Sequence, residues 1–288
     1  MKENKALIIT NIILLGCIII GLLIFMIFGL NGKITFWGGE NELIEKLEFN
    51  DINNNVEVDV KSYDIEIIAN STDKIEVEVY GNEKTKGNVT ISNNGSLEIK
   101  QKRSTLCFGI CRSSKIIIKL PSNYQGKFNL NTISGDIKSN MSFKDSDNSV
   151  STTSGDIKLL DVLKGKISST SGEITINYLK EGKVKTTSGD IEINTIENVD
   201  VSSTSGEIDI DNFTGFGDIG TVSGDIRIDK FEILGNTSFS STSGEIKVKL
   251  MNDAYIIAES VSGDKEIKST RGEYELRAKT ISGDITIK

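Results

Sequence analysis

The sequence of 288 residues contains no histidine, one proline and three cysteines. Without histidine there is no Ser-His-Asp or Cys-His catalytic group and no histidine-ligated zinc site. Three cysteines are too few for a four-thiolate metal or iron–sulfur centre within one chain. Aromatic residues make up only 6%, which is little for a ligand pocket or a base-stacking surface. The net charge of −8 disfavours nucleic acid as a partner. We therefore expect no enzyme activity, no catalytic residues and no cofactor.

One long apolar run is present near the start of the chain. Residues 6–30 carry no charge and are almost wholly apolar, and a transmembrane helix needs about 20 such residues. Lys2 and Lys5 precede the run, and acidic residues follow it in the segment 31–46. The positive-inside rule then places residues 1–5 in the cytoplasm. We predict a single-pass signal anchor at 6–30, a linker at 31–46, and an extracytoplasmic body at the cell membrane.

The cysteines allow two modifications. Leu14-Leu15-Gly16-Cys17 resembles a lipoprotein cleavage box, and lipidation of Cys17 would replace the helix with an acyl anchor. The apolar run continues well beyond Cys17, so we prefer the transmembrane helix. Cys107 and Cys111 lie close together on an expected loop. Outside the cytoplasm they can form a local disulfide, and the alternative is two free thiols.

A repeat dominates the second half of the sequence. The tripeptide Ser-Gly-Asp/Glu occurs nine times, at spacings of 17–20 residues. Its serines are Ser134, Ser154, Ser171, Ser188, Ser205, Ser223, Ser243, Ser262 and Ser282. Each copy is followed by an alternating run such as Ile174-Thr175-Ile176, which predicts a strand with one buried face. We expect the glycine to supply a turn conformation that other residues resist, and the neighbouring Ser and Thr hydroxyls to bond within turns and ladders.

A unit of this length cannot bury its apolar face alone, but stacked copies bury a continuous ladder of Ile and Val. The period fits one coil of a β-solenoid, and the near-absence of proline agrees because proline cannot donate to a ladder. We therefore predict an all-β fold, with solenoid repeats over 131–288. The run Ile285-Thr286-Ile287 is expected to be an uncapped last rung with a bare sheet edge.

The acids of the motif stack with the turns. They occupy either a single column, in which alternating Asp and Glu offset neighbouring carboxylates, or two separate edges. Calcium takes six to eight oxygen ligands, and one acid per unit is a poor match for that number. We expect solvated turn residues and keep calcium binding as the alternative, with Asp156, Glu173, Asp190, Glu207 and Asp225 as candidate ligands.

The segment 47–130 lacks the motif but contains short alternating runs, at 56–60, 65–67, 75–79, 97–99 and 116–118. We predict strands there, which either cap the solenoid or form its irregular first coils.

These short strands, then Ile117-Ile118-Lys119-Leu120-Pro121, then repeated Thr-x-Ser-Gly-Asp-Ile, resemble the bacterial putative-adhesin family of β-strand repeat proteins (domain of unknown function 4097). The resemblance covers residues 47–288. It implies a β-solenoid in the cell envelope and transfers no catalytic residue.

The preferred function is a non-catalytic, membrane-anchored scaffold or adhesin-like protein that contacts an envelope protein or polysaccharide. The alternatives are a sensor ectodomain acting through membrane partners, a self-assembling filament, and a carbohydrate-active β-helix enzyme.

Overall fold

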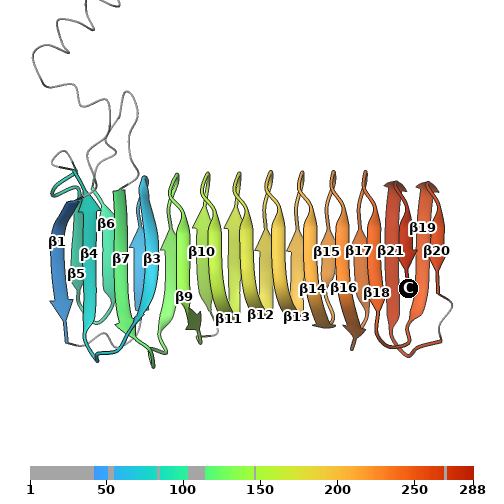
Figure 1. Cartoon of the computed structure of the whole chain (residues 1–288), viewed down its shortest axis with the longest axis horizontal. Coiled ribbons are helices and arrows are strands. Elements are labelled where there is room, and N and C mark those ends of the chain that lie inside the picture. Colours follow the sequence, from blue (N-terminus) through green and yellow to red (C-terminus); the bar gives the residue numbers. More distant parts are fainter. Residues whose placement is uncertain (1–41, 51–54, 83–84, 103–113, 146, 269–270) are drawn as a thin grey trace, which may run out of the picture. The chain divides into compact units, whose positions relative to one another are not determined.

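The computed structural model of the chain describes residues 42–50, 55–82, 85–102, 114–145, 147–268 and 271–288. The regular elements of these residues are all β-strands, and they form a β-solenoid of about 8 turns (Figure 1). The all-β solenoid prediction is confirmed. The predicted membrane span at 6–30 lies outside the described residues, as do Cys17, Cys107 and Cys111. In the part that is described, no helix is long and apolar enough to cross a bilayer.

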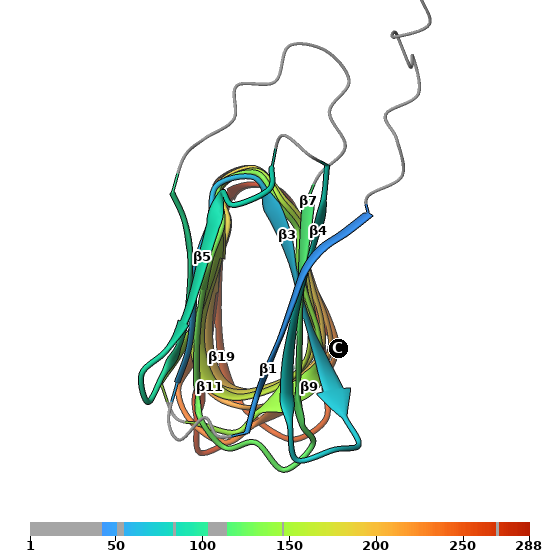
Figure 2. The same cartoon turned by 90° about the vertical axis from the view of Figure 1, so that its left-hand side faces the viewer.

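The solenoid is flattened, with two long sides that face each other (Figure 2). One side, the post-turn sheet, holds the strands that follow the Ser-Gly-acid turns and their continuation toward β1. In spatial order it consists of β1 (Glu42–Phe49), β4 (Ile75–Gly81), β7 (Ser114–Pro121), β3 (Tyr63–Asn70), β9 (Ile137–Phe143), the first halves of β11 (Ile157–Ser169), β12 (Ile174–Lys185) and β13 (Ile191–Ser202), then β14 (Ile208–Gly215), β16 (Ile226–Ile233), β18 (Ile246–Leu250), β22 (Ile285–Ile287) and β20 (Lys265–Ile267).

The other side, the pre-turn sheet, holds the strands that lead into the turns and their continuation toward β5. In spatial order it consists of β5 (Val89–Asn93), β6 (Leu97–Gln101), β2 (Asn55–Asp59), β8 (Lys127–Asn131), β10 (Asn148–Thr152), the second halves of β11, β12 and β13, then β15 (Asp218–Gly220), β17 (Thr237–Ser240), β21 (Glu275–Ser282) and β19 (Tyr255–Ser262).

The core is a set of apolar files between the two sheets. From β9 to β22 in spatial order, the first residue of each strand that follows a Ser-Gly-acid turn is buried and lies in register with its counterpart on the next rung, as in Ile157, Ile174 and Ile191. Phenylalanines stack in the same way, with the ring centroids of Phe213 and Phe231 4.5 Å apart. Burial of these files is the main stabilising term for a stack whose units have no core of their own.

The segment before the repeats both starts and caps the solenoid. The predicted strands correspond to β2, β3, β4, β6 and β7. β2, β3, β6 and β7 join the parallel ladders, so they are its first coils. β4 pairs antiparallel with β7 and with β1, and β5 pairs antiparallel with β6. These antiparallel strands close the end of both sheets.

Rung order departs from chain order near both ends of the solenoid. At the far end β21 lies between β17 and β19, and β22 lies between β18 and β20. The prediction that Ile285–Ile287 is a bare last rung is therefore wrong, because this strand has a partner on each side. The outermost rung is instead β19 with β20. Near the other end, the rung of β2 and β3 lies between the rungs of β6/β7 and β8/β9.

Candidate functional site

The Ser-Gly-acid turns stack in one column along the solenoid. The amide after each acid donates to the carbonyl of the acid on the next rung, as in Ile157 N to Glu173 O at 2.9 Å and Ile174 N to Asp190 O at 3.0 Å. The same pattern continues at the far end of the solenoid, where β22 lies between β18 and β20: Ile285 N donates to Asp264 O. Of the two arrangements left open by the sequence, the structure has the single column.

The motif glycines are needed for close backbone approach. Most of them, including Gly172 and Gly189, do not have a positive φ, so the expected special turn conformation is wrong for those positions. A Cβ on Gly172 would instead overlap the carbonyl oxygen of Gly155, and a Cβ on Gly189 would overlap that of Gly172. Glycine is the residue that allows rungs to stack this closely at the corner.

A column of buried hydroxyls lies beside the glycines. The Oγ of Ser169 donates to Gly155 O at 3.2 Å, and Thr221 and Ser241 make the same contact one rung back at 3.2 and 3.1 Å. These bonds satisfy carbonyls of buried or partly buried glycines at the corner. The prediction that the Ser and Thr residues of the motif region are ladder hydrogen-bonders is confirmed at these positions.

The aspartates of the Ser-Gly-acid turns accept hydrogen bonds from backbone amides of the next rung. Asp156 Oδ1 accepts the backbone N–H of Glu173 at 3.0 Å, and Asp190 Oδ1 accepts that of Glu207 at 2.9 Å. Asp225 accepts from Glu245 in the same way at 2.7 Å. These hydrogen bonds run between rungs rather than within one turn, and they give one oxygen of each aspartate a backbone partner.

This geometry bears on the calcium candidates. Asp156, Glu173, Asp190, Glu207 and Asp225 form a line along the corner, one to a rung, and not a cage around a point. Among the described residues, no three acidic or thiol side chains gather where they could hold a metal ion. The structure therefore gives Asp156, Asp190 and Asp225 a structural contact, and calcium binding stays an untested alternative.

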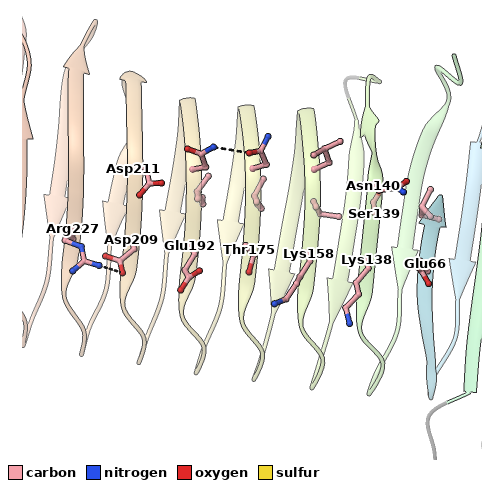
Figure 3. A pocket seen from close by; sticks show the side chains of 17 residues that line it. Glu66, Lys138, Ser139, Asn140, Lys158, Thr175, Glu192, Asp209, Asp211 and Arg227 are labelled. Carbon is pink, nitrogen blue, oxygen red and sulfur yellow. Dashed lines mark hydrogen bonds and ion pairs between the residues drawn. The ribbon is translucent and has the colours of Figure 1, made fainter. Parts of the chain in front are cut away.

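A shallow trough on the outer face of the post-turn sheet is a feature that could receive a partner. It has a volume of about 670 Å³ and runs across β3, β9, β11, β12, β13, β14 and β16 (Figure 3). Outward side chains from successive rungs line it in columns. Lys138 and Lys158 lie toward β3, and Glu192, Asp209 and Asp211 lie toward β16. Glu66 on β3 and Arg227 on β16 lie beyond these groups, so the trough carries charges of both signs along its length.

Amide side chains connect the rungs in and beside the trough. Asn212 Nδ2 donates to Asn194 Oδ1 at 3.3 Å, Asn194 Nδ2 to Asn177 Oδ1 at 3.0 Å, and Asn177 Nδ2 to Asp161 Oδ1 at 3.0 Å. Each amide donates in the same direction along the stack. This amide ladder fixes the side chains of a solvent-facing surface, and a fixed polar surface loses less entropy on binding than a mobile one.

The trough also contains one well-formed ion pair. Arg227 Nη2 lies 2.7 Å from Asp209 Oδ2. Burial raises the pKa of Asp209, and the guanidinium of Arg227 acts in the opposite direction. Leu160 adds an apolar element, with 40% of its surface exposed. The trough therefore offers charged, amide and apolar groups on one rigid face.

The sequence analysis missed this surface because it followed the inward positions of the alternating runs. The signal was present in the residues between them: Lys158, Thr175, Glu192, Asp209 and Arg227 each follow the first inward residue of their strand. Parallel in-register stacking makes such positions neighbours. The acids of the motif, which were singled out, lie at the corner instead.

The chain is similar to several solved structures. A putative adhesin from Bacteroides fragilis NCTC 9343 is 16% identical, with 85% of this chain and 96% of that chain covered and a TM-score of 0.44. A putative lipid binding protein from Parabacteroides distasonis ATCC 8503 is 15% identical, with 85% and 98% covered and a TM-score of 0.42. A putative adhesin from the same organism is 16% identical, with 87% and 98% covered and a TM-score of 0.44.

A comparison with curated proteins finds no match. The family model Toastrack DUF4097 matches residues 53–288, which include both the irregular first coils and all nine Ser-Gly-acid turns. The chain therefore belongs to the Toastrack DUF4097 family, as its sequence resemblance predicts.

Proposed function

We propose that this protein is a non-catalytic binding protein, anchored in the cell membrane through residues 6–30, whose β-solenoid lies outside the cytoplasm. In this proposal it acts as an adhesin-like or scaffolding component of the envelope. Membership of the family and the predicted anchor support the setting. The names of the similar solved structures are compatible with such a role and add no residue-level argument.

The trough is the observation that carries this proposal. Its side chains stand on parallel strands spaced about 4.8 Å apart, and the amide ladder links them from rung to rung. Such a surface is shallow and elongated, which suits an extended polymer or the face of another protein better than a small molecule. The partner class that we propose is therefore an envelope protein or polysaccharide.

The test is photo-crosslinking in intact cells from chosen positions of the full chain. A photoreactive residue at Leu160, on the trough, is expected to capture an envelope component. The same residue at Lys166, which is exposed on the outer face of the pre-turn sheet, is the matched control. Equal capture from both positions, or none from Leu160, would contradict the proposal.

A further inference from the structure

A second hollow lies on the outer face of the post-turn sheet, nearer the far end of the solenoid, where β22 lies between β18 and β20. It has a volume of about 780 Å³ and crosses β16, β18, β22 and β20. One acidic side chain lines it, that of Asp229, together with six cationic side chains: Arg227, Lys230, Lys247, Lys249, Lys268 and Lys288. The protein as a whole has a net charge of −8, so the charge of this basic groove is opposite in sign to the net charge of the chain.

Three of these lysines stand on consecutive rungs. Lys288 N donates to Val248 O at 3.0 Å, and Leu250 N donates to Lys288 O at 2.7 Å, which places Lys288 level with Lys249. Lys268 N donates to Ile287 O at 2.8 Å, which places Lys268 level with Lys288 on the other side. Like charges opposite one another on neighbouring strands are destabilising.

Elsewhere on the solenoid some cations face a carboxylate on the next rung, although Lys138 lies level with Lys158 and Lys166 with Lys183. Lys164 lies 2.9 Å from Glu181, and Lys183 lies 2.9 Å from Asp200. Within the basic groove, Arg227, Lys247 and Lys288 also have acidic partners. No ion pair among the described residues includes Lys230, Lys249 or Lys268, and all three side chains are exposed. The groove therefore concentrates positive charge that the protein does not neutralise.

We propose that the basic groove binds a short anion that carries several phosphate groups. A phosphate monoester brings a charge of about −1.5 to −2 and three acceptor oxygens, so each group can meet ammonium groups from two neighbouring rungs. Charge-assisted hydrogen bonds of this kind are strong. A carboxylate brings a single charge and fits this density less well. The groove adjoins the trough, with which it shares Arg227, but its three unpaired lysines lie outside the trough. The proposal does not depend on the proposed function.

Binding is tested by calorimetry with inorganic tripolyphosphate, on the full chain in a neutral detergent because of its apolar run. The triple variant Lys230→Gln, Lys249→Gln, Lys268→Gln is expected to weaken binding by at least about tenfold. The control variant Lys144→Gln, Lys166→Gln, Lys185→Gln removes the same charge from exposed positions outside both hollows and is expected to change affinity less than about twofold. Circular dichroism of both variants checks that the solenoid is retained.

Comparison ligands separate the outcomes. No binding of tripolyphosphate, equal loss in both variants, or equal affinity for polyaspartate would overturn the proposal. Lysine-dependent binding both to tripolyphosphate and to vesicles of phosphatidylcholine and phosphatidylglycerol, in which phosphates of neighbouring headgroups lie side by side, would support it and identify a lipid source. Lysine-dependent binding to tripolyphosphate without vesicle binding would support it and identify a soluble source.

Discussion

Single residues of the repeat act between rungs rather than within one turn. The glycine allows the carbonyl of the preceding rung to approach, the hydroxyl two positions before the motif serine bonds that carbonyl, and the aspartate accepts an amide of the next rung. A substitution in one turn therefore disturbs two turns. The effect at each position depends on the stacked neighbour and not on local turn preference.

The glycine gives the sharpest prediction at this scale. Gly189→Ala is expected to lower the free energy of unfolding by about 1–3 kcal/mol, because its Cβ overlaps Gly172 O and the rungs must separate. Urea unfolding measures the change. The neighbouring variant Ser188→Ala, at an exposed side chain of the same turn, is the control and should change stability by less than about 0.5 kcal/mol. Equal stability of the two variants would contradict the stacking argument.

The repeat predicts the turns, the strands and the buried face from residue pattern alone, because period two and a fixed spacing are local signals. It does not predict why Gly189 must be glycine. A turn that needs a positive φ and a corner that needs close approach between coils both select the same residue. The distinction appears only when the position of the neighbouring rung, here Gly172, is known.

At the scale of elements, the antiparallel cap contains a buried carboxylate with defined partners. Glu78 of β4 is 7% exposed and accepts hydrogen bonds from Lys119 Nζ of β7 at 2.8 Å and from Tyr80 at 3.0 Å. Lys46 of β1 lies 3.6 Å away. The hydrogen bond from Lys119 is the largest cause that lowers the pKa of Glu78 below its ordinary value of 4.5. This carboxylate thus links three strands of the cap.

The pH dependence follows from the direction of this shift. Since the pKa of Glu78 is lower in the folded state, its contribution is present above pH 4.5 and disappears as pH falls through the lowered folded value. Glu78→Gln is expected to destabilise the protein by about 1–3 kcal/mol at neutral pH and to lose less stability on acidification. Chemical unfolding measured across the acid range tests this. Glu42→Gln, at an exposed residue of β1, should keep the wild-type pH profile; a Glu78→Gln profile parallel to the wild type would contradict the assignment.

At the scale of the whole molecule, the order of the rungs is the feature that the sequence did not predict. Near-constant spacing suggests that copies stack in the order in which they occur. Ile285–Ile287 has the same alternating pattern as strands such as Ile174–Ile176, so nothing in its own residues shows that it lies inside β20 rather than at the edge. Its position depends on where the loops on either side of β19 and β20 cross. Gly272 has a role there, because a Cβ on it would overlap the backbone of Asp253 and Ala254.

Engineered disulfides can test this order. Ser238 of β17 lies in register with Arg277 of β21, and Arg277 lies in register with Ile257 of β19. In a background where the three native cysteines are serine, Ser238→Cys with Arg277→Cys is expected to oxidise readily, because adjacent rungs are about 4.8 Å apart. Ser238→Cys with Ile257→Cys spans two rungs, about 10 Å, and should stay reduced. Mass spectrometry after oxidation identifies the product, and the reverse result would mean that the copies stack in chain order.

The displaced rungs also determine how this molecule responds to force. A strand at the edge of a stack can peel away one hydrogen bond at a time, because it has one neighbour. A pull on Lys288 instead loads β22, which is bonded to β18 on one side and β20 on the other. To detach β22, the pull must break the hydrogen bonds to both neighbours together, or detach β20 along with it. The same placement protects β2 and β3 near the other end. Because the rung order differs from the chain order at both ends, this solenoid should unfold at a higher force than one whose rungs stack in chain order.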